Sequence, residues 1–300
     1  MTSRSGLLWV ALGASLWGTD TVLRRPLTAS LTSGQIVFAE HLILSFALLP
    51  VFWRSRAEWR KLGWRQWAAV TGVAWGGSAL GTLCFTQAIR LGNPTTAVLL
   101  QKTQPVFAAL LAGALLGERL GARFWAWLAA AAAAAYLIAF GAALPAQPVA
   151  AGPALLAAAA AALWGASTVL GRFVLASVSF PTLTALRILA ATPLLAGIAG
   201  ARLPAIHAGE AVSLLLLALV PGLLALLIYY RGLGRTTASR AAVGELAFPA
   251  TAALLNSLAF GTPVTWTQWA GFVLLTALVT RGAGLQPKRD LRILPTVPTL

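Results

Sequence analysis

The chain has 300 residues, of which 59% are hydrophobic and only 10% are charged, whereas soluble domains carry roughly 25% charged residues. A soluble fold of this composition would lack a polar surface, so the composition excludes a globular domain and indicates a protein embedded in a lipid bilayer. The net charge of +15 does not indicate nucleic-acid binding, because most Lys and Arg residues lie in short segments between apolar runs.

Ten apolar runs follow one another along the chain, and most approach the roughly 20 residues that cross a hydrocarbon core of about 30 Å. The sequence therefore predicts ten transmembrane helices joined by short connections. Residues 1–18 hold Arg4 and then an apolar stretch without a clear cleavage site, which favours a retained first helix over a signal peptide. The predicted helices span residues 7–23, 34–53, 67–89, 95–116, 124–144, 153–170, 180–199, 211–230, 238–260 and 266–283.

The Lys and Arg residues are unevenly divided between the two sides of the membrane. If the N-terminus is cytoplasmic, sixteen of the 22 lie in inside segments, and four lie outside: Arg24, Arg25, Arg90 and Arg202. Cytoplasmic loops carry such an excess of positive charge. We therefore expect a multi-pass protein of the inner (plasma) membrane with both termini in the cytoplasm.

The two halves of the sequence repeat. Shifted by 147 residues, Leu16-Trp17-Gly18 falls on Leu163-Trp164-Gly165, and shifted by 144 residues, Pro105 falls on Pro249. Each half holds five predicted helices, an odd number, so the second half must be inverted relative to the first. Inverted repeats are typical of alternating-access carriers, whose site lies near the midplane between the repeats.

The predicted fold is thus an all-α integral membrane protein, with ten transmembrane helices in two inverted five-helix repeats around a central cavity. We expect the first repeat at residues 1–147 and the second at 148–285. Residues 286–300 are polar and contain proline, which predicts a disordered cytoplasmic tail.

Residues 87–120 read QAIRLGNPTTAVLLQKTQPVFAALLAGALLGERL, a helix with an internal proline, small residues and a Gly-Glu-Arg end. This stretch resembles the fourth-helix signature of the drug/metabolite transporter superfamily, EamA type. The repeated Leu-Trp-Gly resembles the first-helix motif of that family, and the resemblance covers about residues 7–283. It implies a ten-helix fold with a central cavity and export of metabolites such as amino acids. A branch that exports aromatic amino acids is similar in length and aromatic content.

The sequence departs from the family pattern at two places. Thr262 stands in the second half where the first half has Glu118, so the end motif is not duplicated. At the second-helix position where the family often has Arg, the first half carries Glu40 and the second half keeps Arg187. The two halves are therefore not expected to contribute equivalent polar groups.

Charged side chains at membrane depth are the first candidates for a site, since each costs roughly 2.5–3.5 kcal/mol to insert. Lys102 is either a counter-charge for a substrate carboxylate or the partner of a structural salt bridge to Glu245 or Glu40. Glu245 can hold a substrate ammonium or a coupling proton, or pair with Lys102. Glu40 and Arg187 occupy equivalent positions: they either pair with each other, or Glu40 meets a substrate ammonium and Arg187 a substrate carboxylate.

Two further polar residues carry weaker hypotheses. Asp20 either lines the cavity mouth or lies among lipid headgroups. His41 neighbours Glu40 but does not share its helix face, so it is expected to be a bystander. The aromatic residues either stack on an aromatic or apolar ligand or only pack helices together. The predicted substrate-binding residues are Trp17, Glu40, Trp75, Ser78, Gln101, Lys102, Trp164, Arg187, Tyr229, Tyr230 and Glu245.

These charges constrain the substrate. A zwitterionic amino acid uses both signs, whereas a purely cationic drug leaves Lys102 and Arg187 without a role. A phosphorylated sugar would need more clustered cations than these. The sequence thus predicts a secondary transporter that exports amino acids with aromatic or large apolar side chains. Multidrug export of hydrophobic cations is the second alternative, and sugar-phosphate or nucleotide-sugar transport is the third.

The sequence gives little support to classes of protein other than a carrier. The chain has two histidines, one cysteine (Cys84) and no HExxH motif, so an integral-membrane enzyme is a remote alternative, and no catalytic residue, metal or cofactor is expected. A scaffold or a lipid flippase is not separable from a carrier at this level. No nucleotide-binding loop is present, and proton coupling stays open. The expected partners are an amino acid-like small molecule and the lipid bilayer, with no nucleic acid.

The charge distribution gives a first testable prediction. Reporter fusions at Arg4 and after Arg292 should both report a cytoplasmic location, because of the positive-inside bias. An outside signal at either end would contradict the orientation and the inverted repeat together.

Overall fold

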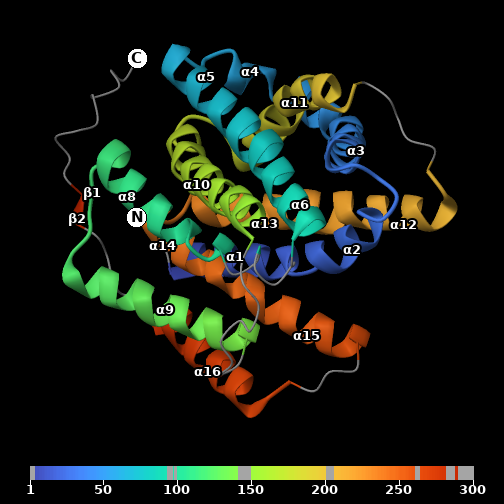
Figure 1. The fold of residues 1–300 in the computed structure, drawn as a ribbon. Coiled ribbons are helices and arrows are strands. Elements are labelled where there is room, and N and C mark those ends of the chain that lie inside the picture. The colour runs from blue at the N-terminus through green and yellow to red at the C-terminus, as the bar shows by residue number, and fades with distance from the viewer. Residues whose placement is uncertain are drawn as a thin grey trace.

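The computed structural model describes residues 4–92, 97, 100–140, 150–200, 206–260, 264–281 and 288–289. Almost all of these residues are helical, and the helices pack into one bundle (Figure 1). The first half contains α1 (Arg4–Trp17), α2 (Asp20–Leu27), α3 (Ser33–Arg54), α4 (Arg56–Trp59), α5 (Trp64–Thr71), η1 (Gly72–Gly81), α6 (Thr82–Leu91), α8 (Gln104–Leu116), β1 (Glu118–Arg119) and α9 (Ala122–Phe140). The second half contains α10 (Ala151–Val174), α11 (Phe180–Ala199), α12 (Ala208–Leu217), η2 (Ala218–Leu224), α13 (Ala225–Leu233), α14 (Ala238–Gly244), η3 (Glu245–Ala247), α15 (Phe248–Phe260), α16 (Trp266–Arg281) and β2 (Lys288–Arg289).

Every predicted apolar run carries helix in the part of the chain that the structure describes, which confirms the all-α fold in two five-helix halves. The predicted runs at residues 95–116, 238–260 and 266–283 carry α8, α14 to α15, and α16, respectively. Residues 95–96, 98–99, 141–144 and 282–283 of the predicted helices lie outside the described residues, as does the tail except Lys288–Arg289. Seven helical spans are long and apolar enough to cross a membrane: Ser5–Leu27, Ser33–Arg54, Trp64–Leu91, Ala122–Phe140, Ala151–Val174, Phe180–Ala199 and Ala208–Leu233.

Local sequence signals fix several helix ends. α3 begins at a capping box, in which Thr32 Oγ1 accepts a hydrogen bond from the Gln35 backbone N–H and Gln35 Oε1 accepts one from Thr32 N–H. α8 and α11 each end at a glycine in the left-handed conformation, Gly117 with φ 64° and Gly200 with φ 71°. A side chain at these positions would be strained, so glycine is the residue that ends these helices.

Two spanning helices contain a stretch of π-helix at equivalent places in the two halves. Shifted by 144 residues, 74–80 within η1 falls on 218–224, which is the whole of η2. π-Turns inside α-helices are frequent at functional sites because they redirect side chains and disturb the backbone hydrogen-bond ladder. Residues of both π-segments line the cavity described below.

The repeated Leu-Trp-Gly motif marks two close helix crossings. A Cβ on Gly18 would lie 2.7 Å from the Ala252 backbone nitrogen, so α1 and α15 approach too closely for a side chain. A Cβ on Gly165 would lie 3.0 Å from the Ala108 backbone nitrogen, so α10 and α8 approach in the same way. The shifts of 147 and 144 residues relate Gly18 to Gly165 and Ala108 to Ala252. The first helix of each half therefore crosses the fourth helix of the other half.

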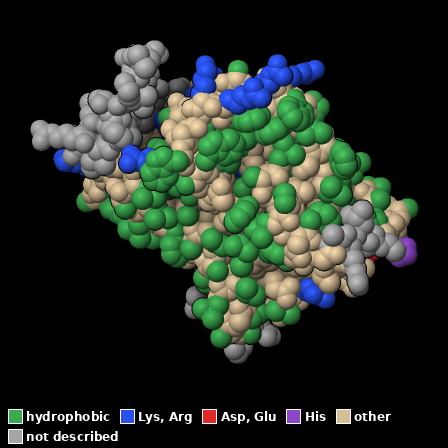
Figure 2. All heavy atoms as spheres, turned by 90° about the horizontal axis from the view of Figure 1, so that it is seen from above, with side chains coloured by type: hydrophobic (Ala, Val, Ile, Leu, Met, Phe, Trp, Pro, Cys, Tyr) green, Lys and Arg blue, Asp and Glu red, His purple; other side chains and the backbone are tan. Residues whose placement is uncertain are grey.

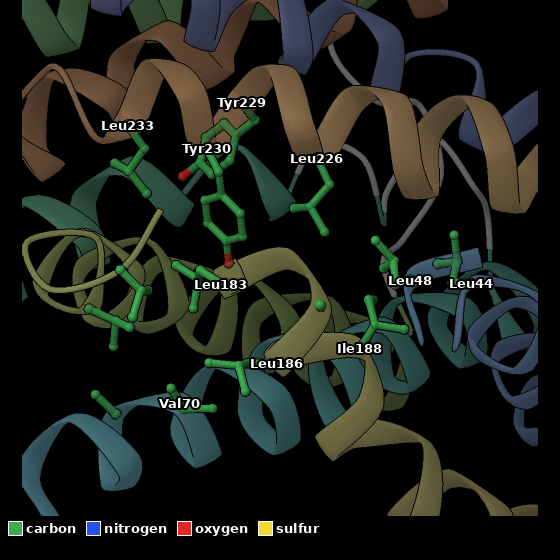
Figure 3. Close-up of a cluster of buried hydrophobic side chains, with 14 of the residues drawn as sticks. Leu44, Leu48, Val70, Leu183, Leu186, Ile188, Leu226, Tyr229, Tyr230 and Leu233 are labelled. Carbon is green, nitrogen blue, oxygen red and sulfur yellow. The ribbon is translucent and has the colours of Figure 1, made fainter. Parts of the chain in front are cut away.

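The second helices of the two halves, α3 and α11, pack against each other. Ser45 on α3 and Thr192 on α11, which are exactly 147 residues apart in sequence, join their hydroxyls over 2.8 Å. This contact between equivalent residues indicates the pseudo-twofold axis of the repeat. Figure 3 shows part of the buried cluster around these helices, in which α3, α5, α11 and α13 contribute Leu44, Leu48, Val70, Leu183, Leu186, Ile188, Leu226, Tyr229, Tyr230 and Leu233.

α9 and α16, the fifth helices of each half, pack together at one side of the bundle (Figure 1). Trp127 Nε1 donates to the Leu278 carbonyl over 3.1 Å, and Gln268 Nε2 donates to the Ile138 carbonyl over 2.9 Å. Each half thus supplies one side chain that reaches a backbone carbonyl of the other. These bonds hold the two fifth helices in register.

The outer surface is apolar, as a bilayer requires. Figure 2 shows hydrophobic side chains over most of one face, with Lys and Arg gathered toward its edges. Phe46, Leu155, Leu258 and Val273 are among the most exposed large apolar side chains of the described residues. Exposed apolar surface on this scale fits contact with lipid rather than water.

A carboxylate joins the two halves at one end of the bundle. Both oxygens of the buried Glu118 carboxyl, at the end of α8, accept hydrogen bonds from the backbone N–H groups of Ala238 (2.8 Å) and Ser239 (3.2 Å), and Ser239 Oγ donates a further bond. Glu118 therefore caps the N-terminus of α14. Beside it, β1 pairs antiparallel with β2, so Lys288–Arg289 of the predicted disordered tail is an ordered pairing segment.

The close helix crossing at Gly18 leads to a prediction about the stability of the protein. Gly18→Ala should destabilise the protein by about 1–3 kcal/mol, the usual cost of overpacking, because its Cβ would meet the backbone of α15. Thermal unfolding of the purified protein in detergent measures this change. Gly152→Ala is the matched control, since a Cβ there meets nothing within 4 Å. Equal melting temperatures for the two variants would contradict the close crossing.

Candidate functional site

A cavity lies between the two halves. The centre of a water-sized sphere can move within about 140 Å³ of this space. One water needs about 10–15 Å³ by this measure, so the cavity holds on the order of ten waters. At roughly 30 Å³ of liquid volume per water, this is room for a small metabolite. The first half lines it with Trp17, Asp20, Arg24, Glu40, His41, Leu44, Ser78, Thr82, Phe85, Gln101 and Gln104. The second half lines it with Trp164, Ser167, Thr168, Arg187, Ile188, Pro221, Gly222, Leu226, Tyr229, Tyr230 and Phe248.

Two aromatic pairs face the cavity, one from each crossing. Trp17 on α1 packs on Tyr229 of α13 with ring centroids 4.8 Å apart, and Trp164 on α10 packs on Phe85 of α6 at 5.2 Å. The repeat relates Trp17 to Trp164 and Phe85 to Tyr229. Both predicted tryptophans therefore line the site, and each is held by a partner ring contributed by the other half.

Arg24 is the central cation of the first half. Its Nε and Nη2 donate to the two Asp20 oxygens over 2.7 and 2.6 Å, and Nη2 also donates to Glu40 Oε2 over 3.0 Å. Only 1% of Arg24 is exposed. The assignment of Arg24 to an outside loop was therefore wrong, as was the suggested Glu40–Arg187 pair. Asp20 and Arg24 lie one helical turn apart on the same face of α2, and the Arg24 guanidinium bridges Asp20 and Glu40.

Arg187 of the second half has a different environment. Its Nε donates to Ser78 Oγ over 2.6 Å and its Nη1 donates to the Tyr230 hydroxyl over 2.8 Å. Figure 3 shows the Tyr230 ring extending from α13 toward the helix that carries Leu183 and Leu186. Among the described residues, no ion pair joins Arg187 to a carboxylate, so its charge is held by neutral hydroxyls and faces the cavity.

Glu245 begins η3, where the ninth helix is interrupted. Its carboxyl accepts hydrogen bonds from the Tyr229 hydroxyl (2.6 Å), from the Thr168 hydroxyl (3.0 Å) and from Gln104 Nε2. The predicted residues Tyr229 and Glu245 are thus in direct contact. Gln101, the equivalent of Glu245 in the first half, lines the cavity, and its buried Oε1 has no hydrogen-bond partner among the described residues.

Lys102 and Glu245 share a small side chamber that adjoins the cavity and has Trp17, Gln101, Gln104 and Phe248 in common with it. Lys102 Nζ lies 3.9 Å from the centroid of the Phe248 ring, a cation–π arrangement. No ion pair connects Lys102 to Glu245 or Glu40 in the described part of the chain, so the structure does not support the salt-bridge alternative. A role for Lys102 in substrate binding stays a prediction.

Trp75 lies away from the cavity. The side chain is 48% exposed, and its Nε1 donates to the Ala190 carbonyl over 3.0 Å, which joins η1 to α11. His41, expected to be a bystander, does line the cavity: its Nδ1 contacts the Val37 carbonyl and its buried Nε2 has no partner in the structure. Within the described residues, no group of three His, Cys, Asp or Glu side chains is placed to hold a metal.

The lining residues that were not predicted as site residues include Arg24, Phe85, Gln104 and Thr168. The repeat carried a signal for two of them. Phe85 is the equivalent of Tyr229, and Thr168 lies in the second copy of the Thr-Val-Leu sequence that follows the first-helix motif. For Arg24 the signal was Asp20, which lies four residues earlier and so on the same helix face. No sequence signal pointed to Gln104, because its hydrogen-bond partner, Glu245, is distant in sequence.

Comparison with known proteins agrees with this geometry. The EamA-like transporter family matches the chain twice, over residues 4–140 and 152–279. The riboflavin transporter ImpX of Fusobacterium nucleatum is 33% identical over 284 residues, which cover 90% of this chain and 94% of that protein. A protein of known crystal structure superimposes with a TM-score of 0.75 over 93% of this chain and 96% of its own, at 20% identity, which is a likeness of fold.

The buried Arg24 cluster predicts non-additive stability. Arg24→Gln and Glu40→Gln should each destabilise the protein by about 3–5 kcal/mol, because each leaves a buried charge with less compensation. The double variant should lose clearly less than the two added together. Denaturation of all three in detergent measures this coupling. Arg25→Gln, at the exposed neighbouring arginine, is the control and should change stability little. Additive losses would contradict the pair.

Proposed function

The chain belongs to the EamA-like transporter family, and we propose that it is a secondary carrier that moves a small metabolite through the central cavity by alternating access. As a family member it is a multi-pass membrane transporter of small molecules, and membership indicates transport rather than catalysis. Its placement in the inner membrane, with both termini in the cytoplasm, is part of the proposal and rests on the positive-inside bias.

The two aromatic pairs carry the proposal for the substrate. They give the cavity ring faces from both halves, Trp17 with Tyr229 and Trp164 with Phe85, and such faces suit a flat ring system. Polar groups around the rings, among them Arg187, can orient it through hydrogen bonds. Riboflavin is a flat, polar-substituted ring compound and the named substrate of a relative, so a flavin-like metabolite is the first candidate.

An amino acid with an aromatic side chain is the second candidate. Arg187 faces the cavity without a carboxylate partner among the described residues, and the Glu245 carboxyl lies behind Tyr229. A zwitterion would use both signs, and the family resemblance implies export of such metabolites. A hydrophobic cation is less favoured because an uncompensated guanidinium would repel it. A sugar phosphate is less favoured because Arg24 is already neutralised by two carboxylates.

The deciding experiment is transport by purified protein in proteoliposomes. The panel holds riboflavin, aromatic amino acids, a quaternary ammonium drug and a hexose phosphate, each labelled. Uptake of riboflavin would support the first candidate, and uptake of amino acids alone would support the second. Transport of the quaternary ammonium drug and nothing else would overturn both.

The aromatic pair yields a prediction about affinity. Trp17→Leu should weaken riboflavin binding about two- to tenfold, since an aromatic contact contributes about 0.5–1.5 kcal/mol beyond its area and 1.4 kcal/mol is a tenfold change. Quenching of riboflavin fluorescence on titration with protein measures the dissociation constant. Trp75→Leu is the matched control outside the cavity and should leave the affinity unchanged. Equal weakening by both variants would contradict the placement of the site.

A further inference from the structure

Three side chains that line the cavity also donate hydrogen bonds to the Glu245 carboxyl. Tyr229, Thr168 and Gln104 all line the cavity and all donate to this carboxyl, whereas Glu245 itself faces the side chamber. Resting on the proposed carrier function, we infer that Glu245 binds the coupling proton and that substrate and proton bind together. The three donors transmit the occupancy of the cavity to the carboxyl.

The surroundings of Glu245 differ from those of the other buried carboxyl in the site. Glu40 lies 3.0 Å from a fixed cation, the Arg24 guanidinium. Glu245 has no such partner among the described residues, and its charge is stabilised by two hydroxyls and one amide. A carboxyl of this kind inside a membrane protein can alternate between charged and neutral forms, as the carboxyls of proton relays do.

Few titratable groups face Glu245. Tyr229 on α13 contacts it directly, and Tyr230 follows on the same helix. Lys102, which precedes α8, lines the same side chamber. The other packed elements present Thr168 from α10, Gln104 from α8, Trp17 from α1 and Phe248 from α15, none of which titrates in the ordinary range. Proton exchange at this site therefore involves the Glu245 carboxyl, with Lys102 as its nearest basic neighbour in the chamber.

The three hydrogen-bond donors that Glu245 shares with the cavity decide whether substrate and proton move in the same direction or in opposite directions. A polar substrate in the cavity competes with Glu245 for the Tyr229 and Thr168 hydroxyls and the Gln104 amide. When these groups turn to the substrate, the carboxylate loses the hydrogen bonds that stabilise its charge in a low-dielectric site. A proton from solution then binds a carboxyl oxygen, and the same proton leaves to solution on the opposite side as the substrate departs. Substrate and proton thus travel in the same direction, and a proton gradient drives the substrate to the side that the protons enter.

Transport driven by a pH difference tests the coupling. Proteoliposomes with the membrane potential clamped should accumulate riboflavin about tenfold per unit of inward pH gradient if one proton accompanies each substrate. Glu245→Gln keeps the shape and an acceptor oxygen but cannot ionise, so its accumulation ratio should fall to one, and any riboflavin exchange that it supports should not depend on the pH gradient. Glu245→Asp should restore part of the gradient-driven accumulation.

A second measurement detects the proton without any substrate. The infrared absorption of protonated carboxyls in the purified protein, followed as the pH is lowered, should contain a contribution that Glu245→Gln removes and Glu245→Asp retains. Glu58→Gln is the control, because Glu58 lies at the surface and caps α11 through Ser179. Thermal unfolding of each variant verifies that it is folded.

The outcomes separate the inference from the proposed function. If the wild type moves none of the panel compounds, the proposed function fails, and the infrared signal alone decides whether Glu245 binds a proton. If the wild type transports riboflavin without regard to the pH gradient, or Glu245→Gln still accumulates it, the coupling is overturned. Loss of accumulation in Glu245→Gln together with loss of its infrared signal supports the inference.

Discussion

The contact that the rest of the structure depends on is the close crossing of the first helix of each half on the fourth helix of the other. Gly18 and Gly165 allow it, because any larger residue would meet the backbone of the neighbouring helix. The residue before each glycine is a tryptophan, and the crossing turns Trp17 and Trp164 into the space between the halves. The cavity is therefore built by helix packing, and its aromatic walls follow from the same motif.

Charge compensation decides which polar groups of the cavity are free to act. Arg24 is deeply buried and already satisfied by Asp20 and Glu40, so it serves the structure of the first half. Arg187 has only neutral hydroxyl partners among the described residues, and its full charge can contribute to binding. A fixed counter-charge therefore distinguishes the two arginines: among the described residues, only Arg24 has one.

The sequence was sufficient for the features that depend on local pattern. Hydropathy located the helices, and the Trp-Gly repeat predicted the two halves and both cavity tryptophans. The pairing of Glu40 was missed because its equivalence to Arg187 suggested a symmetric contact, whereas the cation comes from Arg24 on the first helix. Trp75 was proposed only as one of several aromatic residues that could stack on a ligand, and residue type alone does not give the direction of a side chain. It lies in the π-segment η1, where its Nε1 donates to the Ala190 carbonyl of α11.

Inverted repeats offer two equivalent ways to close the cavity, and differences between the halves decide which is favoured. Glu118 caps α14 with both carboxyl oxygens, which joins the end of the fourth helix to the start of the ninth. The equivalent position in the second half is Thr262, and a neutral side chain there cannot supply the same charge-assisted contact. A helix cap of this type contributes on the order of 1–2 kcal/mol. That corresponds to a factor of about 5 to 30 in an equilibrium. Because the Gly-Glu-Arg end motif occurs only in the first half, this charge-assisted cap has no counterpart in the sequence of the second half, and the repeat is asymmetric at this position.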